Sequence, residues 1–433
     1  MPTHTITLDT VGLLAAGEHG LSAADLAAVD ARLPALRDRL QRERAAGQHG
    51  YLNLPGNSPL LESVLEACQP RLGRFRHLVV LGIGGSSLGL RALVNAMQPV
   101  AAPRVDLHIV DNTDPALFAQ VIARVDLPQT QFVVVSKSGG TIETVLALGY
   151  FAEKLRHAGL SLVDHMVAVT DAVNGPLRRF AEQQGLDTCE IPPEVGGRFS
   201  VLTGAALVPA TMMELDVATL MSGASRTEAL CRSGDFAQDW PARLGLIAAE
   251  LCRRGKSQLV FMPYSSRLRS VSDWFVQLWD ESLGKDRDEQ GRPAVSGQTA
   301  IPAAGATDQH AQLQLFLEGP NDKVLLFTRI EKHELDPPLG DFEWGDFDAA
   351  FVKGRTLGEV INAQHAGTAQ ACVERKRPNA TLILPKLDAS TLGELLMGLM
   401  SATTYAGFAF GVNPYDQPSV ELGKKISRRM MGG

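Results

Sequence analysis

Between residues 77 and 191, short apolar segments alternate with segments whose apolar residues recur at helical spacing. The spacing predicts helices at 87–97, 115–124, 141–158 and 174–185, and strands at 77–82, 105–110, 131–136, 165–170 and 188–191. Such alternation is typical of a parallel sheet with helices on both faces. In a 2-1-3-4-5 strand order, the first and third strands are neighbours and flank the topological switch point, where ligands bind.

A Gly-rich turn follows the third predicted strand, where residues 136–144 read SKSGGTIET. The N-terminus of a helix offers unpaired backbone N–H groups and the positive end of the helix dipole. The turn adds several hydroxyl groups, a lysine at Lys137 and two glycines that let the backbone approach a ligand. The pattern therefore predicts a site for a small phosphate group. An ordinary Ser/Thr helix cap is the structural alternative.

A second Gly-rich turn, GIGGSSLG at 82–89, follows the first predicted strand. It resembles a dinucleotide-binding turn of the G-x-G-x-x-G kind, but Ser87 occupies the third glycine position. Asp111 ends the next strand, about where a ribose-binding acid is expected, so dinucleotide binding stays open as an alternative.

The remaining chain predicts N-terminal helices, a second α/β unit and closing helices. Pro34 interrupts a helical stripe near the N-terminus, which indicates a kinked helix or two short ones. In the second unit we expect a helix at 270–283 and strands at 258–262, 311–317, 323–329 and 380–384. Helical patterns cover 205–254, 392–408 and 421–430, and the composition of 331–355 is typical of loops. We place the domain boundary between residues 215 and 216.

Composition excludes several classes of function. The net charge of −7 gives no bulk attraction to nucleic acid or an anionic membrane. The five cysteines are scattered without a C-x-x-C pair, which favours reduced thiols in the cytosol over disulfides or a zinc site. We find no signal peptide, no apolar run long enough to cross a membrane, and no histidine cluster of the kind that binds a metal.

Four features of the sequence are compatible with acid–base chemistry. Arg198 follows two glycines, and an apolar helix ends with Asp280 and Glu281, either of which is a candidate proton acceptor. His310 follows a polar turn, and Lys424 lies near the start of the last helix. Each of these features, taken alone, also has an ordinary structural explanation.

Taken in order, these segments resemble the phosphoglucose isomerase family, whose members contain two sugar-isomerase (SIS) domains. The resemblance spans about residues 77–427 and is carried by GIGGSSLG (82–89), SKSGGTIET (136–144), GGRFSVLTG (196–204), QLWDESLGK (277–285), GATDQHAQLQLFLEGPNDK (305–323) and NPYDQPSVELGKK (413–425). It implies an α/β fold of two SIS-type three-layer αβα domains with mainly parallel sheets, plus N-terminal helices and a C-terminal helix.

The resemblance also implies roles for particular residues. The residues expected to hold a sugar phosphate are Ser86, Ser136, Lys137, Ser138 and Thr141, and those expected to line the same pocket are Gly85, Glu143 and Gly197. Glu281 is expected to move the proton between C2 and C1, and Arg198 to stabilise the enediolate. His310 and Lys424 are expected to assist opening of the sugar ring.

By the same resemblance we expect interconversion of glucose 6-phosphate and fructose 6-phosphate in a cytoplasmic homodimer, without a cofactor or metal. The dimer is implied because the family counterpart of His310 comes from the neighbouring subunit. Two alternatives stay open: an isomerase that also accepts mannose 6-phosphate, and a phosphosugar-binding regulator without catalysis. The chain departs from the usual family pattern at Gly140, Tyr415 and Ser419, where threonine, phenylalanine and glycine are usual.

Overall fold

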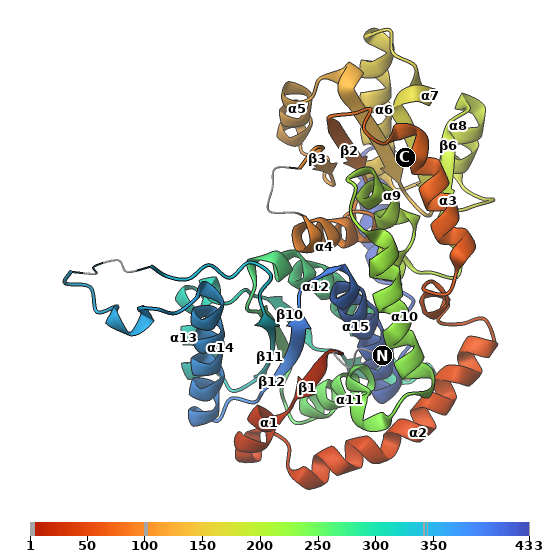
Figure 1. Ribbon diagram of the computed structural model, residues 1–433. Helices are drawn as coiled ribbons and strands as arrows, with labels where there is room; N and C mark the ends of the chain where they lie inside the picture. The colour runs from red at the N-terminus through yellow and green to blue at the C-terminus, as the bar shows by residue number, and fades with distance from the viewer. Residues whose placement is uncertain (1–4, 99–102, 341–342, 344, 433) are drawn as a thin grey trace.

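The protein contains two five-stranded sheets, each with helices on both faces (Figure 1). The computed structural model describes residues 5–98, 103–340, 343 and 345–432. The first sheet lies in the upper part of Figure 1 and the second in the lower left. A two-stranded hairpin, β8 (Lys285–Arg287) and β9 (Pro293–Ser296), follows helix α12 (Arg269–Leu283).

The first sheet is entirely parallel and has the order β3-β2-β4-β5-β6, which confirms the predicted 2-1-3-4-5 arrangement. Its strands are β2 (His77–Leu81), β3 (Asp106–Val110), β4 (Thr130–Val135), β5 (Met166–Thr170) and β6 (Asp187–Glu190). All six residues of β4 are buried, as expected for a central strand covered on both faces.

The predicted helices of the first unit are confirmed within one or two residues. They are α4 (Leu88–Met97), α5 (Pro115–Arg124), α6 (Ile142–His157) and α8 (Pro176–Gln184), with the short α7 (Leu162–His165) before β5. The Asp114 side chain accepts a hydrogen bond from the first turn of α5, and Gly185 ends α8 in a left-handed conformation.

The second sheet has the order β1-β12-β11-β7-β10. Its strands are β1 (Thr7–Asp9), β7 (Gln258–Pro263), β10 (Thr299–Pro302), β11 (Lys323–Lys332) and β12 (Asn379–Lys386). Strand β1 is antiparallel to β12, and the other pairs are parallel. Because β1 comes from the start of the chain, the N-terminal residues contribute to both units, and the boundary at 215/216 stays a prediction.

The prediction of a strand at 311–317 is wrong, because the structure forms helix α13 (Leu313–Glu318) there. The segment alternates apolar and polar residues, but Leu313, Phe316 and Leu317 reach the core at helical spacing while Leu315 is exposed. Strands β1, β8, β9 and β10 were not predicted, and each has only three or four residues. Pro34 lies inside one continuous helix, α2 (Ala23–Ala45).

One hydrophobic core joins the two sheets. It contains one face of each sheet together with residues of α4, α9 (Gly204–Met212), α10 (Val217–Ser233), α11 (Trp240–Arg253), α12 (Arg269–Leu283) and α15 (Ala389–Phe410). Helix α15 is buried from Thr391 to Ala409 and packs against α10, α11 and α12. The opposite faces are covered by α5, α6, α7 and α8 on the first sheet, and by α13 and α14 (Leu357–Glu374) on the second.

The remaining helices lie at the two ends of the chain. They are α1 (Val11–Ala15), α2 and α3 (Ser58–Cys68) near the N-terminus and α16 (Val420–Met430) near the C-terminus. Every residue of α16 is exposed, although it is strongly amphipathic. Within the described ranges, each helix is too short or too polar to span a bilayer.

Candidate active site

Both Gly-rich turns lie at the carboxyl edge of the first sheet, after the neighbouring strands β2 and β4. In the turn after β4, the Ser136 hydroxyl donates to Thr141 Oγ1 at 3.2 Å and accepts from the backbone N–H of Gly139 at 3.1 Å. Gly139 has a φ of 68°, which favours glycine. Ser138 Oγ lies 3.4 Å from Thr141 Oγ1, so three hydroxyl groups gather at the N-terminus of α6.

Lys137 links this turn to the loop that precedes Arg198. Its ammonium donates to the backbone oxygens of Pro193 at 2.6 Å and Val195 at 2.8 Å. Burial lowers the pKa of Lys137, and the nearby carboxylates of Asp171 and Glu194 oppose that shift. The lysine therefore adds positive charge beside the turn while its own hydrogen bonds go to the backbone.

The turn after β2 contacts, through its backbone, the 3₁₀ segment η6 (Gly197–Leu202) that carries Arg198 and is called the Arg198 loop below. A Cβ atom added to Gly85 would lie 2.0 Å from the carbonyl oxygen of Gly197, so only glycine allows this approach. Ser200 Oγ also donates to the Gly85 carbonyl at 3.3 Å. Ser86, the last residue of the short 3₁₀ helix η4 (Gly84–Ser86), is half-buried at the same edge.

Arg198 is only 4% exposed, and four acceptors surround its guanidinium. Its Nε donates to Ser282 Oγ at 2.7 Å, Nη1 to Gln417 Oε1 at 2.8 Å, and Nη2 to the backbone oxygens of Pro414 and Asp416 at 2.5 and 3.1 Å. Burial lowers the pKa of Arg198, and the nearby Glu281 and Asp416 carboxylates oppose this shift, so the group keeps its charge.

Glu281 lies near the C-terminal end of α12, facing Arg198. Its Oε1 is 3.6 Å from Arg198 Nη1, and its Oε2 accepts from Gln277 Nε2 at 3.2 Å. Gln277 also contacts the other turn, because a Cβ on Gly84 would be 2.9 Å from its Nε2. Helix α12 therefore brings an acid to the carboxyl edge of the first sheet.

Asp280 occupies a different environment from its neighbour Glu281. Its Oδ1 accepts from the backbone N–H of Ala300 at 2.8 Å, on the edge strand β10. Burial raises the pKa of Asp280 to about 6, and the Ala300 hydrogen bond opposes the shift. The residue pattern alone left both acids open and the family resemblance chose Glu281, whose contacts with Arg198 and Gln277 differ from those of Asp280.

The structure does not bring His310 and Lys424 to this group of residues within one chain. His310 is exposed at the end of the 3₁₀ helix η9 (Thr307–His310). Lys424 is exposed on α16 and pairs with Glu421 at 2.7 Å. In the part of the chain that the structure describes, neither side chain bonds to Arg198 or Glu281. Glu143 is half-buried in the first turn of α6, beside the hydroxyl groups.

Four further residues of the site were missed by sequence reasoning. Ser282 and Gln417 accept from Arg198, Gln277 donates to Glu281, and Lys285 Nζ donates to the backbone oxygens of Glu281 and Asp416 at 3.0 and 2.5 Å. Gln277 and Lys285 carried a usable signal, since each is four residues from Glu281. The contacts of Ser282 and Gln417 with Arg198, and of Lys285 with Asp416, join segments that are far apart in the sequence.

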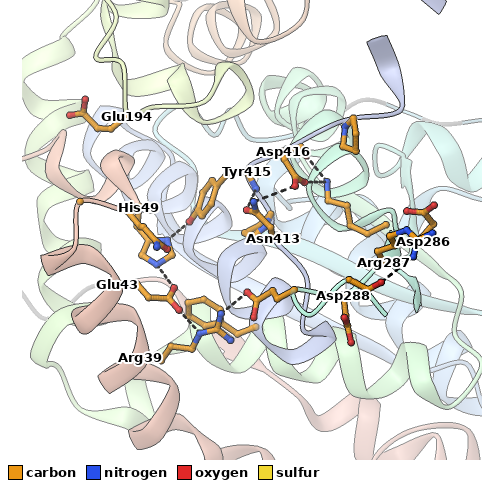
Figure 2. A pocket seen from close by; sticks show the side chains of 18 residues that line it. Arg39, Glu43, His49, Glu194, Asp286, Arg287, Asp288, Asn413, Tyr415 and Asp416 are labelled. Atoms are coloured by element: carbon orange, nitrogen blue, oxygen red, sulfur yellow. Dashed lines mark hydrogen bonds and ion pairs between the residues drawn. The ribbon is translucent and has the colours of Figure 1, made fainter. Parts of the chain in front are cut away.

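A cleft of about 900 Å³ lies next to this site, between α2, the β8–β9 hairpin and residues 413–418 (Figure 2). Its lining includes Arg39, Glu43, His49, Tyr415 and Asp416 but neither Gly-rich turn and not Glu281. The cleft therefore borders the segment that holds Arg198 but lies apart from the Gly-rich turns and from Glu281. In the described ranges, no three His, Cys, Asp or Glu side chains are placed to hold a metal ion.

The fold and this site define an α/β protein of the SIS type, with two Gly-rich turns opposite an acid–arginine pair. A sequence model of the family described as "Phosphoglucose isomerase" matches residues 71–432. The chain belongs to this family.

Similar proteins cover nearly the whole chain. Glucose-6-phosphate isomerase of Rubrobacter xylanophilus is 38% identical over 99% of this chain and 98% of its own, and one from Thermus thermophilus is 37% identical over 89% and 90%. The crystal structure of a hypothetical protein from Thermus thermophilus superposes with a TM-score of 0.90 and 35% identity, over 99% of this chain and all of that one. A glucose-6-phosphate isomerase from Chlamydia trachomatis shares the fold at a TM-score of 0.84 and 22% identity, over 95% of this chain and 86% of its own.

Proposed function

We propose that this protein catalyses the reversible interconversion of glucose 6-phosphate and fructose 6-phosphate, a step of glycolysis and gluconeogenesis. Membership of the family and the names of the similar proteins support this activity. The observation that carries it is the Glu281–Arg198 pair, with 3.6 Å between Oε1 and Nη1, beside the two Gly-rich turns. A regulator that only bound a sugar phosphate would need the turns but not this pair.

Glu281 is the proposed base. A hydrogen next to a carbonyl group is weakly acidic, so its removal needs a base held at the right position. The Gln277 amide and the Arg198 guanidinium hold the carboxylate from two sides. In the proposed reaction, Glu281 removes the proton from C2 of the open-chain aldose and returns it to C1, while the hydroxyl proton passes from O2 to O1. The C1 carbonyl thereby becomes a hydroxyl group and C2 becomes the ketose carbonyl, and the reverse reaction uses the same steps.

Arg198 is the proposed stabiliser of the enediolate. Negative charge develops on the substrate oxygens when the proton leaves, and a fixed positive charge in a water-poor site lowers the energy of that state. Nε and Nη2 are bound to Ser282 and to the backbone of residues 414–416, which fix the orientation of the guanidinium. Nη1, which faces both Gln417 and Glu281, is the group best placed to bind a substrate oxygen.

The phosphate group is proposed to bind at the N-terminus of α6. The proposed ligands are the hydroxyl groups of Ser86, Ser136, Ser138 and Thr141, with the backbone N–H groups of the turn. Lys137 contributes charge beside them. Gly85 and Gly197 form the close backbone contact that closes the pocket wall, and Glu143 lines it. Binding energy from the phosphate then orients the sugar.

We propose a homodimer in which His310 and Lys424 assist ring opening, with His310 donated to the site of the other subunit. His310 is exposed and makes no bond to Glu281 within the described part of one chain, which supports this arrangement. The free state of all five cysteines, four of them buried, supports a cytoplasmic location.

A coupled assay tests the proposed activity. Purified protein is mixed with fructose 6-phosphate, glucose-6-phosphate dehydrogenase and NADP in the presence of EDTA. We expect NADPH to form at a rate proportional to the protein concentration. No NADPH formation, with measurable binding of fructose 6-phosphate, would contradict the proposed activity and favour a regulator. Rates with mannose 6-phosphate, measured in the same way, define the range of substrates.

A further inference from the structure

Residues 413–417, which join α15 to α16, supply most of the acceptors of Arg198. Pro414 and Asp416 contribute backbone oxygens and Gln417 contributes its side-chain oxygen. Lys285 also binds this segment, through the backbone oxygen and the carboxylate of Asp416. The position of the Arg198 guanidinium therefore depends on how firmly residues 413–417 are held.

Tyr415 anchors the middle of this segment (Figure 2). Its hydroxyl lies 2.5 Å from His49 Nδ1 and 3.0 Å from Thr404 Oγ1 on the buried helix α15. Its ring packs against Phe199, next to Arg198, at a centroid distance of 5.1 Å. Burial raises the pKa of Tyr415 well above its usual range, so the hydroxyl keeps its proton and acts as a donor.

His49 is held by the N-terminal helix α2. Its Nε2 lies 2.8 Å from Glu43 Oε2, and the carboxylate can only accept, so Nε2 carries the proton and Nδ1 accepts from Tyr415. Arg39 in turn donates to Glu43 at 2.6 Å (Figure 2). His49 is 4% exposed and has a φ of 56°, a backbone conformation that, apart from glycine, mainly asparagine, aspartate and histidine adopt.

We propose that His49 and Tyr415 are positioning residues, which hold residues 413–417 and thereby orient Arg198 toward the enediolate. The inference rests on the proposed isomerase activity. It assigns a task in catalysis to residues before 71, where the match to the family begins. A phenylalanine at position 415 would pack in the same place without the hydrogen bond to His49.

The main test compares Tyr415→Phe with Tyr51→Phe. Tyr51 is the matched control because its buried hydroxyl bonds to the same Thr404 Oγ1 at 3.0 Å and its ring packs against Phe199, but it lies outside residues 413–417. We expect Tyr415→Phe to lower kcat for fructose 6-phosphate by about three- to tenfold, the usual effect of one hydrogen bond. KM should stay within about twofold, because Arg198 acts on the enediolate. Tyr51→Phe should leave kcat unchanged.

A second measurement does not depend on activity. Hydrogen exchange of backbone amides in residues 411–420 should be faster in Tyr415→Phe than in the parent and unchanged in Tyr51→Phe. His49→Asn should lower kcat as Tyr415→Phe does, because asparagine tolerates the left-handed backbone but does not reproduce the hydrogen bonds of the histidine ring. The kcat of the double variant should be no lower than that of either single variant. An unchanged rate of hydrogen exchange in Tyr415→Phe would show that the Tyr415 hydroxyl does not hold residues 413–417. This result does not depend on whether the parent protein is an isomerase. Equal losses of kcat in Tyr415→Phe and Tyr51→Phe would show that Tyr415 has no specific role in orienting Arg198.

Discussion

The two sheets are built alike, but they contribute to the candidate site in opposite ways. The first sheet presents the turns after β2 and β4, where helix N-termini and hydroxyl groups gather. The second unit contributes the C-terminal end of α12, which carries Glu281. At the carboxyl edge of the second sheet, β10 is followed by the 3₁₀ helix η9, which ends at His310. This histidine does not bond to Glu281 in the described part of one chain.

This difference follows from the polarity of helices. Helix N-termini present N–H groups and positive potential, which suit a phosphate, whereas helix C-termini present carbonyl groups and negative potential. The candidate site therefore combines the N-terminus of one helix, α6, with the C-terminal end of another, α12. We infer that His310, which follows the carboxyl edge of the second sheet, contributes to the site of the neighbouring subunit.

The largest effect is expected for Glu281→Gln, which removes the base but keeps the shape of the side chain. We expect kcat to fall about 10³-fold, within the range for loss of a positioned base, while the dissociation constant for fructose 6-phosphate measured by calorimetry changes little. Asp280→Asn is the control, since its side chain faces Ala300, and its kcat should stay near that of the parent. A Glu281→Gln enzyme that retained a tenth of the parent activity would exclude Glu281 as the base.

Mixing two inactive variants tests whether His310 completes the site of the other subunit. We expect Glu281→Gln and His310→Gln to be nearly inactive alone. If His310 completes the site of the other subunit, a hybrid dimer has one intact site, and equal mixing with subunit exchange restores about a quarter of the parent activity. No recovery, in a sample whose hybrid dimers are demonstrated by mass spectrometry, would place His310 and Glu281 in the same chain's site.

Gly85→Ala tests the close backbone contact at the first sheet. The added Cβ would lie 2.0 Å from the Gly197 oxygen, so the turn and the Arg198 loop must separate. We expect a loss of about 1–3 kcal/mol in the free energy of unfolding, and a higher KM for fructose 6-phosphate. Gly149→Ala on α6 is the control, because nothing lies within 4 Å of its added Cβ. Equal melting temperatures for both variants would contradict this account.

The smallest effect concerns the pH dependence of stability through Asp280. Burial raises the pKa of this carboxyl from 3.8 to about 6, so the folded protein binds more protons than the unfolded chain between these values. The free energy of unfolding should therefore fall by about 2 kcal/mol as the pH rises from about 4 to about 6. Asp280→Asn should remove this part of the slope in urea titrations. An unchanged slope would show that Asp280 titrates normally.

Much of the first unit was predictable because its signals are local. The apolar run of β4, the turn SKSGGTIET and the helical spacing of α6 lie within one stretch of about thirty residues. The short strands β8, β9 and β10 escaped prediction because three or four residues carry too little pattern. The strand predicted at 311–317 was wrong because alternation over so short a run fits a strand as well as a helix.

The sequence by itself determined the parallel first sheet, the position of both Gly-rich turns and the set of chemical groups available to the site. The residues alone left Glu281 and Asp280 equivalent, and the family resemblance chose Glu281. The tertiary structure gave the two acids different partners, since adjacent residues of a helix point in different directions. It also decided that residues 413–417 surround Arg198 and that Glu43 and His49 support Tyr415. These contacts join segments up to about 370 residues apart, and no local pattern specifies which distant groups will meet once the core is packed.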